Sequence, residues 1–424
     1  MKFKIITLGC KVNQYESEMM REKLINSNFK ETLDNDADIV IINTCSVTNM
    51  ADAKSRKLIR YSKRENKNAI ILVCGCSAEN HKEELLDLGI DILIGNNEKS
   101  KIVELINNFI KTNEKYVKFY NTRNLEFENM AVDKFSNQTR AYMKIQDGCN
   151  NFCAFCIIPF MRGTIRSKDI NEAYEEAKTL VKNNHKEIVL TGIHTGSYGT
   201  GKDYDLVDLL EKLVTIKGLE RIRLSSIEIT ELNDKFIDFL KNNPKLCNHL
   251  HIPLQSGCDK ILKLMNRKYD LSYFKEKIAK IREVRDSINI STDVIVGFPN
   301  ETEQDFLDTV KFCKEIGFSK IHVFPYSKRT GTKASVMDNQ LDMSIKRDRA
   351  RKLIEVSEKL EENYNSLFLN KEVEVLIEEI KDGISIGHTS NYIKVEVKEV
   401  LNRNEFYNVI ITSIDKDKVI ARLI

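Results

Sequence analysis

Short apolar runs rich in β-branched residues recur along the first part of the chain, and charged stretches with helical periodicity separate them. The first three runs occupy residues 4–8, 38–43 and 69–73. Such runs are typical of parallel strands that are buried on both faces, and the stretches between them are typical of the helices that cover a parallel sheet. The pattern therefore predicts an N-terminal α/β domain.

A second series of strand-like runs alternates with amphipathic stretches such as residues 171–183 and 272–285. The runs are residues 141–145, 187–190, 221–224, 249–252, 293–296 and 320–324. Such βα units predict a barrel with strands inside, helices outside and its reactive side at the carboxyl ends of the strands. Because the barrel is incomplete, its open side would let a macromolecular substrate reach the centre.

The last part of the chain changes from helical to strand periodicity. Residues 343–369 form one long helical pattern. The short alternating runs after it are residues 372–377, 385–389, 392–397, 405–412 and 419–424. Short strands of this kind predict a small five-stranded barrel of the oligonucleotide-binding type.

We therefore expect an α/β protein with three domains and two connecting segments. In chain order these are an N-terminal parallel α/β domain, a linker, a partial (βα)6 barrel, a connecting helix and a small β-barrel. Their expected bounds are residues 1–112, 113–139, 140–343, 344–370 and 371–424.

The composition indicates the cellular compartment but says little about the function. A hydrophobic content of 42% suffices for several cores, and no apolar stretch reaches membrane-spanning length. The chain begins directly with a strand pattern and shows no apolar signal segment, so we expect a cytoplasmic protein without a membrane partner. In a reducing compartment the ten cysteines are more naturally metal ligands than disulfides. The net charge of +3 gives no argument for a nucleic-acid partner.

The most specific chemical signal is the C-x3-C-x2-C spacing of Cys149, Cys153 and Cys156. Three thiolates on a short loop can bind three irons of a cubic iron–sulfur cluster, which leaves the fourth iron open to a cofactor. A zinc site would need a fourth ligand nearby, and neither His185 nor His194 has zinc-ligand spacing. A disulfide framework suits short secreted chains. The spacing therefore predicts an iron–sulfur cluster.

A second cysteine set follows the N-terminal strand runs. Cys10 follows the first run, Cys45 the second, and the pair Cys74 and Cys76 ends the third. The carboxyl ends of parallel strands meet at one edge of a sheet, so these cysteines should converge and form a second three-cysteine site. The alternative is that each packs as a small buried hydrophobe. Spacing alone leaves open whether Cys74 or Cys76 completes the set.

The segment 147–163 resembles the signature of the radical S-adenosylmethionine (SAM) methylthiotransferases, and the similarity in layout extends over essentially the whole chain. These enzymes install sulfur and a methyl group on an unactivated carbon. Their G-C-x-x-N, N-T-C and G-C-x-A motifs match residues 9–13, 43–45 and 75–78. The resemblance implies that Cys10, Cys45 and Cys76 are ligands and that Cys74 packs within its strand.

The resemblance also implies the cofactors, which are two [4Fe–4S] clusters and SAM. The Cys149 cluster would cleave SAM to a 5′-deoxyadenosyl radical, the Cys10 cluster would carry sulfur, and a second SAM would supply the methyl group. An electron donor such as flavodoxin or ferredoxin would serve the first cluster. No catalytic residue beyond the cluster ligands is implied. The strand-end residues that would contact SAM are Gly192, His194, Ser226, Gln255 and Asp293.

Residues 9–14 resemble the branch of the family that acts on N6-threonylcarbamoyladenosine beside the tRNA anticodon. This makes the tRNA anticodon stem-loop the expected partner. The isopentenyladenosine branch usually carries glutamine and methionine where this chain has Lys11 and Val12. A third branch modifies an aspartate of a ribosomal protein. From another class, the chain could be an iron–sulfur redox sensor that binds RNA. Enzymes that insert sulfur into lipoate or biotin precursors also have two clusters but would not need the C-terminal barrel.

Several further side chains have open roles. Arg56, Arg60, Arg64 and Lys67 share one face of an expected helix over residues 52–67, which is either a solvated surface or a strip that contacts phosphates. Residues 387–392 resemble the loop of the RNA-binding TRAM domain. The negative charge of residues 371–424 gives that role no support, so it depends on His388 or Tyr392 as stacking groups. We expect structural roles for the residues His249, His251, Cys247, Cys258 and Cys313.

Overall fold

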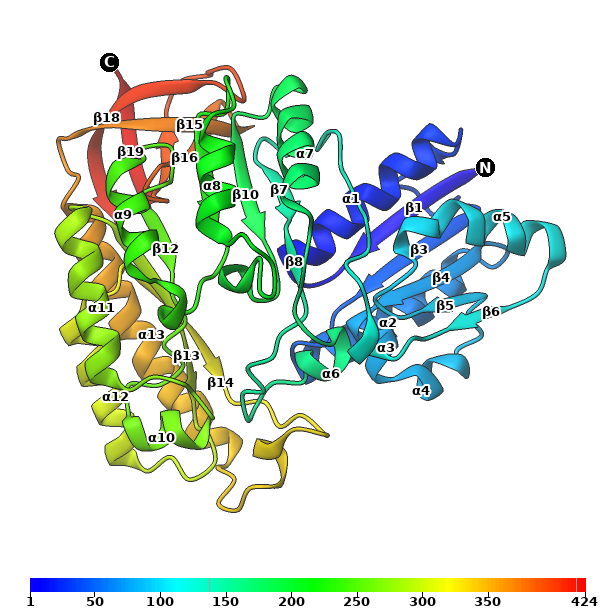
Figure 1. The fold of residues 1–424 in the computed structure, drawn as a ribbon, viewed down its shortest axis with the longest axis horizontal. Coiled ribbons are helices and arrows are strands. Elements are labelled where there is room, and N and C mark those ends of the chain that lie inside the picture. Colours follow the sequence, from blue (N-terminus) through cyan, green and yellow to red (C-terminus); the bar gives the residue numbers. More distant parts are fainter. Residues whose placement is uncertain (137, 417) are drawn as a thin grey trace.

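The computed structural model describes residues 1–136, 138–416 and 418–424. Figure 1 shows an N-terminal α/β unit (blue to cyan), a central arc of strands covered by helices (green to yellow) and a small C-terminal barrel (orange to red). The expected fold class is confirmed. No helix in the described ranges is both long and apolar enough to cross a membrane.

The N-terminal unit is a six-stranded parallel sheet with the strand order β2-β1-β3-β4-β5-β6. The strands are β1 (Lys2–Thr7), β2 (Lys30–Glu31), β3 (Ile39–Thr44), β4 (Ile70–Gly75), β5 (Ile92–Ile94) and β6 (Tyr116–Lys118). Alternate residues of β3 enter different cores, because Ile39 and Ile41 lie on one face and Val40 and Ile42 on the other. This arrangement explains the continuous apolar runs.

Helices cover both faces of this sheet. On the face of Ile39 and Ile41 lie α1 (Lys11–Asn26) and α5 (Ile102–Thr112), which follows η1 (Lys99–Lys101). On the opposite face lie α2 (Asn49–Glu65), α3 (Cys76–Asn80) and α4 (Lys82–Leu86). The expected helix over residues 52–67 is therefore α2, but Lys67 lies beyond its end.

The segment expected to be a linker is more ordered than its sequence indicates. It contributes β6, which pairs with β5, and η2 (Thr122–Asn124). The side chains of Met130, Val132 and Phe135 are buried in the main core. A three-residue edge strand and isolated apolar anchors are too short to produce a recognisable period, which is why the sequence showed none.

The central arc consists of two three-stranded parallel sheets, β11-β10-β7 and β12-β13-β14. Parallel bridges from Ile222 to Leu246 and from Ser226 to His251 join them. The strands are β7 (Ala141–Lys144), β10 (Glu187–Thr191), β11 (Arg221–Leu224), β12 (His249–His251), β13 (Asn289–Val296) and β14 (Lys320–Pro325), and a short pair is β8 (Gln146–Asp147) with β9 (Arg166–Ser167). The expected partial barrel of six parallel strands is present.

Helices cover the outer side of the arc (Figure 1). They are α7 (Ile170–Lys182), α8 (Leu206–Val214), α9 (Asp234–Asn242), α10 (Asp259–Leu264), α11 (Leu271–Val284) and α12 (Glu303–Ile316), with α6 (Ile158–Arg162) after the three-cysteine loop. Short 3-10 turns are η3 (Thr195–Ser197), η4 (Ile229–Glu231) and η5 (Lys333–Val336). Because Asp169 and Thr302 accept backbone N–H bonds at the starts of α7 and α12, these helices have well-defined N-termini.

One strand boundary was predicted wrongly. The fifth barrel strand starts at Asn289, so Asp293 lies in the middle of β13 rather than at its start. The preceding polar side chains hid this part of the strand. Ser291 bonds to two histidines of β12, and the Thr292 hydroxyl accepts the backbone N–H of Leu254 at 2.9 Å. Polar residues that pair inside a barrel break the apolar pattern on which strand recognition depends.

Helix α13 (Met343–Ser366) packs along β14 and leads to the C-terminal barrel. That barrel is closed, with the order β15-β16-β17-β19-β18. Its strands are β15 (Glu372–Lys381), β16 (Ile384–Thr389), β17 (Lys394–Val397), β18 (Phe406–Asp415) and β19 (Lys418–Leu423). Arg221 donates to the carbonyl oxygens of His388 and Glu374 at 3.1 and 3.0 Å, so the barrel is attached to the amino-terminal part of β11. The expected five-stranded barrel is confirmed.

Candidate active site between two cysteine triads

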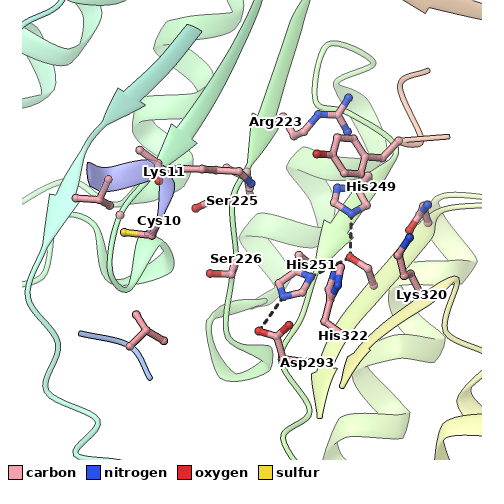
Figure 2. Close-up of a pocket in the computed structure, with 18 of the residues that line it drawn as sticks. Cys10, Lys11, Arg223, Ser225, Ser226, His249, His251, Asp293, Lys320 and His322 are labelled. Atoms are coloured by element: carbon pink, nitrogen blue, oxygen red, sulfur yellow. Dashed lines mark hydrogen bonds and ion pairs between the residues drawn. The ribbon is translucent and has the colours of Figure 1, made fainter. Parts of the chain in front are cut away.

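A cavity of about 1060 Å³ lies where the three parts of the chain meet. The N-terminal unit, the central arc and the C-terminal barrel all contribute to its wall. Figure 2 labels wall residues of the first two parts. Representative wall residues are Cys10, Cys45, Cys76, Cys156, Gly192, Ser226, His251, Asp293 and Tyr392. Its volume is at the upper end for small-molecule sites, so it can hold more than one small ligand group.

The structure brings Cys10, Cys45 and Cys76 together on one wall of this cavity. Each follows a neighbouring parallel strand, respectively β1, β3 and β4. The first two loops approach so closely that a Cβ atom on Gly9 would lie 2.6 Å from the Cys45 Sγ, and Gly9 has a φ of +98°. Only glycine fits this position without strain. Cys74 is fully buried within β4 and does not line the cavity.

Polar residues of the three N-terminal motifs fix the loops to each other. The Asn13 side-chain amide donates to the carbonyl oxygens of Leu8 at 2.7 Å and Thr44 at 2.9 Å. The Asn43 amide donates to the carbonyl oxygen of Asn13 at 3.0 Å. The Thr44 hydroxyl accepts the Ala78 N–H at 3.2 Å, which connects the second loop to the third. These contacts explain why the motifs contain asparagine and threonine beside the cysteines, which the cysteine spacing alone did not explain.

The second triad lies on the loop between β8 and α6, where Cys149, Cys153 and Cys156 are half-buried. Arg267 donates to the Cys153 Sγ at 3.2 Å, and the backbone N–H of Asn151 donates to the Cys149 Sγ at 3.4 Å. Burial raises the pKa of the Cys156 thiol to about 12. The ionised sulfur therefore needs a strong positive partner, which a metal centre supplies.

The donor sets fit iron–sulfur clusters. Each triad offers three soft sulfur ligands, and hydrogen bonds from arginine and backbone N–H groups are typical partners of such sulfurs. Among the residues the structure describes, no three His, Cys, Asp or Glu side chains, those of the two triads included, are arranged to hold a single metal ion. Both histidines considered for zinc have other partners. His185 bonds to the backbone of Thr139 and Phe135, and His194 pairs with Glu231 at 2.7 Å.

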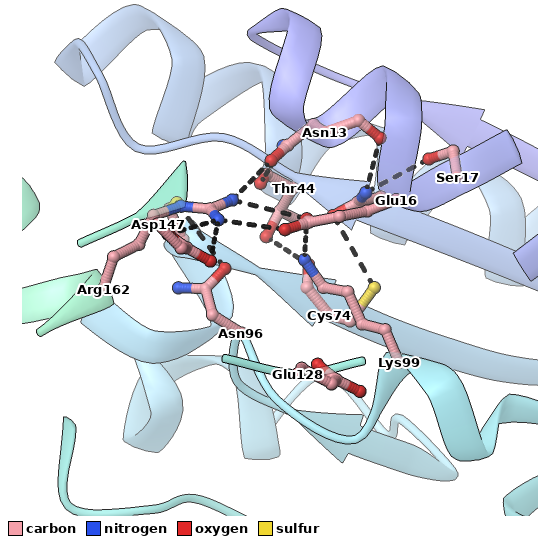
Figure 3. A network of polar contacts seen from close by, with 12 residues as sticks. Asn13, Glu16, Ser17, Thr44, Cys74, Asn96, Lys99, Glu128, Asp147 and Arg162 are labelled. Carbon is pink, nitrogen blue, oxygen red and sulfur yellow. Dashed lines mark hydrogen bonds and ion pairs between the residues drawn. The ribbon is translucent and has the colours of Figure 1, made fainter. Parts of the chain in front are cut away.

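Arg162 lies in a network of polar contacts with Asn13, Glu16 and Asp147 (Figure 3). Its side chain is fully buried; Nε donates to the Cys76 Sγ at 3.3 Å, and Nη1 pairs with Glu16 at 3.0 Å. The same Nη1 pairs with Asp147 at 3.2 Å, two residues before the first cysteine of the second triad. One guanidinium group thus contacts a cysteine of the first triad and the start of the loop that carries the second.

The network around Arg162 holds more positive than negative charge. Lys144 pairs with both Glu16 and Asp147 at 2.7 Å, Lys99 also pairs with Glu16, and Arg166 pairs with Asp147 at 3.3 Å. Four cations therefore surround two carboxylates. Burial would raise the pKa of Glu16 and Asp147, but these cations hold both pKa values well below the ordinary range. The excess positive charge lies beside Cys76, where it favours an anionic metal–thiolate group.

The expected SAM contacts divide into two groups. Gly192, Ser226 and Asp293 line the cavity, whereas His194 and Gln255 are not part of its wall. His194 pairs through its Nε2 with Glu231 at 2.7 Å and contacts the Asn151 side chain at 3.4 Å. Gln255 has a left-handed backbone with a φ of +67°, and its N–H donates to the Asp293 carbonyl oxygen at 2.8 Å.

The structure adds wall residues to which the sequence analysis gave only structural roles. His249 and His251 both contact the Ser291 hydroxyl, at 3.0 and 2.9 Å, and His251 also pairs with Asp293 at 3.2 Å. Their period-2 spacing showed that they share a face. It could not show that this face borders a cavity rather than a core, because both kinds of surface need paired polar groups.

The C-terminal barrel closes one end of the cavity with Tyr392. Its ring stacks on His249 and on His388, each with a centroid separation of 4.8 Å, and the Arg223 guanidinium lies 4.6 Å from its centroid. Burial raises the pKa of the Tyr392 hydroxyl, but Arg140, Lys11 and Arg223 together bring that pKa below its ordinary value. This end of the cavity is therefore polar and positively charged.

A partial parallel barrel with a C-x3-C-x2-C loop beside its central cavity defines a radical SAM protein. A sequence profile of the Radical SAM superfamily matches residues 143–313, and a profile described as Uncharacterized protein family UPF0004 matches residues 2–95. The radical S-adenosylmethionine methyltransferase TsrM of Kitasatospora setae has the same fold, with a TM-score of 0.57 and 13% identity over 79% of this chain and 75% of that chain.

Similar curated proteins define a narrower class within the radical SAM superfamily. The threonylcarbamoyladenosine tRNA methylthiotransferase MtaB of Bacillus subtilis is 42% identical over 402 residues, which cover 92% of this chain and 89% of that protein. The MtaB protein of Thermotoga maritima is 38% identical over 99% of this chain and 96% of its own length. The tRNA-2-methylthio-N(6)-dimethylallyladenosine synthase of Clostridium perfringens is 36% identical over 89% of this chain and 86% of its own length.

The chain belongs to the radical SAM methylthiotransferase family. It is therefore an enzyme that uses SAM and [4Fe–4S] clusters, and the redox-sensor alternative is set aside.

Replacing Arg162 tests the connection between the triads. Arg162→Met removes one buried cation from Glu16 and Asp147, which keep Lys99, Lys144 and Arg166 as partners. We therefore expect a loss of up to about 3–5 kcal/mol in the free energy of unfolding, the range for a broken buried ion pair. Arg162→Lys keeps the charge but loses the planar fork, and its loss should be smaller. Denaturant unfolding and iron content per chain measure both effects. The exposed pair of Lys178 with Glu175, 2.9 Å apart, is the matched control. If Lys178→Met destabilises the protein as much as Arg162→Met, the network has no special role.

Proposed function

We propose that this enzyme converts N6-threonylcarbamoyladenosine of tRNA to its 2-methylthio derivative. The observation that carries the proposal is the 42% identity to the Bacillus subtilis threonylcarbamoyladenosine enzyme over 92% of the chain, against 36% for the Clostridium perfringens dimethylallyladenosine enzyme over 89%. The cavity supports it, because Cys10, Cys45 and Cys76 of the first triad and Cys156 of the second line a space large enough for a nucleoside and a cofactor group.

We assign the cluster ligands to the two triads. Cys149, Cys153 and Cys156 hold the cluster that binds SAM, and Cys10, Cys45 and Cys76 hold the cluster that carries sulfur. When bound, the clusters and SAM supply the reducing electron, the radical that removes a hydrogen atom, and the sulfur and methyl groups that replace it.

The protein residues hold and orient these groups. The N–H groups of Arg267 and Arg162 donate to one sulfur of each triad, which lowers the cost of the negative charge there. Gly192, Ser226 and Asp293 are placed to contact SAM, since all three lie on the cavity wall: Gly192 and Ser226 follow β10 and β11, and Asp293 lies within β13. His194 and Gln255 do not line the cavity, and Gln255 positions Asp293 by donating its N–H to the Asp293 carbonyl oxygen. An aromatic C–H bond is too weakly acidic for any side-chain base, so none of these residues needs to remove its proton.

The isopentenyladenosine reaction is the second candidate. It is favoured by relatives that are 36–37% identical over 89% of the chain. The cavity wall next to Tyr392 disfavours an isopentenyl substituent, because the charged and polar groups there include Arg223, His249 and His388. A branched hydrocarbon group gains little from such a surface.

The C-terminal barrel contributes by completing this wall. Its stacking residues are already engaged, because Tyr392 packs on His388 and His249. Arg223 donates to the carbonyl oxygens of Ser390 and Thr389 at 3.1 and 3.2 Å. Deleting residues 371–424 would leave these buried donors without acceptors, so point variants are the better test of the barrel's role.

The substrate test uses purified holoenzyme with anticodon stem-loops that carry one defined adenosine. We expect methylthiolation of the threonylcarbamoyladenosine RNA at a rate at least tenfold, on the order of 1.4 kcal/mol of discrimination, above that of the isopentenyladenosine RNA. Mass spectrometry of the digested nucleosides measures both products. Efficient reaction of only the isopentenyladenosine RNA would select the second candidate.

The assignment of the triads predicts different losses in two variants. Cys153→Ala should stop both SAM cleavage and methylthiolation, whereas Cys45→Ala should keep SAM cleavage and stop methylthiolation. The yields of 5′-deoxyadenosine and of modified nucleoside distinguish them. Cys74→Ala is the matched control, since Cys74 lies off the cavity wall in β4, and it should keep both activities. Equal loss of SAM cleavage in Cys153→Ala and Cys45→Ala contradicts the assignment.

The cationic strip on α2 gives a test of RNA binding. Arg60 and Arg64 are exposed, while Arg56 is half-buried and pairs with Glu84 at 3.2 Å. Arg60→Glu with Arg64→Glu should weaken stem-loop binding and flatten its dependence on salt, because each lost phosphate contact removes about 0.9 from the log–log salt slope. Fluorescence anisotropy at salt concentrations between about 50 and 200 mM measures the slope. Over this range the loss of affinity for a few phosphate contacts is on the order of tenfold. Unchanged slopes mean that this face is only a solvated surface.

A further inference from the structure

We propose that Lys11 forms an anion subsite that binds the carboxylate of the substituent on the modified base. This inference rests on the proposed function and deepens it, because it names the group by which the enzyme selects an acidic substituent over a hydrocarbon one.

Lys11 is the first residue of α1 and directly follows Cys10. Its side chain lines the cavity and is half-buried. Figure 2 shows it extending from the Cys10 loop across the cavity, toward the side that carries Arg223 and His249. No hydrogen bond or ion pair joins its ammonium group to any side chain in the described part of the protein, although the cavity wall around it is polar.

The two guanidinium groups around Tyr392 have partners, while Lys394, which also lines the cavity, is exposed to solvent. Arg223 pairs with Glu187 at 2.7 Å, and Arg140 pairs with Glu378 at 3.1 Å. Two carboxylates therefore balance two guanidinium groups, and the charge of Lys11 is left over. A half-buried cation without a partner is costly, and a charge-assisted contact with a ligand anion removes that cost. Lys320 lines the same cavity but already pairs with Glu361 at 2.8 Å.

The end wall next to Lys11 is rigid. Tyr392 has a left-handed backbone conformation with a φ of +65°, which is unfavourable for an aromatic residue unless its surroundings hold it. The rings of His249 and His388 and the guanidinium of Arg223 pack against it. The wall therefore cannot easily change into an apolar pocket, and it presents a fixed polar surface to whatever Lys11 binds.

The chemistry of the substrate matches this position. In adenine, C2 and the carbon that carries N6 are both bonded to N1, so the reacting carbon and the substituent lie on one edge of the ring. If C2 faces the wall formed by Cys10, Cys45 and Cys76, the substituent must lie beside that wall. Lys11 is one residue from Cys10, and its four-carbon stem lets the ammonium reach a carboxylate at the end of the substituent.

Binding measurements with a masked carboxylate test the subsite. The ligands are anticodon stem-loops with threonylcarbamoyladenosine as the free acid or as its methyl ester, and the protein is the holoenzyme with its iron content checked. Wild type should bind the acid about 10- to 100-fold more tightly than the ester, the range expected for a hydrogen bond between charged groups. Lys11→Met should bind both equally, and Lys11→Arg should keep a preference for the acid.

Lys320→Met is the matched control, because it removes a paired cation from the same cavity, and it should leave the ratio of acid to ester affinities unchanged. The subsite is refuted if Lys11→Met keeps the wild-type ratio, or if wild type binds acid and ester equally. Equal weakening of every RNA by Lys11→Met, including one with unmodified adenosine, would show that Lys11 contacts a backbone phosphate instead. The proposed function itself is refuted if the wild-type enzyme methylthiolates the isopentenyladenosine RNA but not the threonylcarbamoyladenosine RNA.

Discussion

The buried ion pairs around Arg162 and Glu16 hold the two cysteine triads in one site. Desolvating these charges is expensive, on the order of several kcal/mol for each ion, and only multiple good contacts compensate for it. Glu16 lies on α1 in the N-terminal unit, whereas Arg162 and Asp147 flank the three-cysteine loop of the central arc. A small rotation of one unit against the other would leave charges buried without partners. The relative position of the triads is therefore strongly determined.

This constraint explains why the cavity is an interface between parts rather than a pocket within one of them. The N-terminal sheet brings Cys10, Cys45 and Cys76, the central arc brings Cys156 and the strand-end residues, and the C-terminal barrel brings Tyr392. Sites at such junctions are common for small ligands. A radical reaction also gains from the arrangement, because the groups that start the reaction and the groups that supply sulfur must approach the same carbon from different directions.

The cavity differs along its length. Beside Asp293 and Ser226 it offers the small and polar groups expected around a cofactor, while beside Tyr392 it offers cations and imidazoles. Lys11 lies between the first triad and this positive end. The proposed reaction requires that the base reach the triad of Cys10, Cys45 and Cys76. The polarity of the far wall is what can distinguish one N6 substituent from another, and its positive charge is the basis on which we propose an acidic one.

The sequence alone determined the fold of each domain and the two sets of cysteines. Buried parallel strands produce continuous apolar runs, a closed small barrel produces short alternating runs, and cluster ligands need fixed spacing, so the fold class and the cysteine motifs were predictable. Only the tertiary structure decided which polar residues face the cavity. Asn289, Ser291 and Thr292 pair inside the barrel, and His249, Arg223 and Lys11 meet Tyr392 from three other segments of the chain. Contacts between segments so far apart leave no period in the chain, because they depend on how finished units pack and not on the local conformation of any one of them.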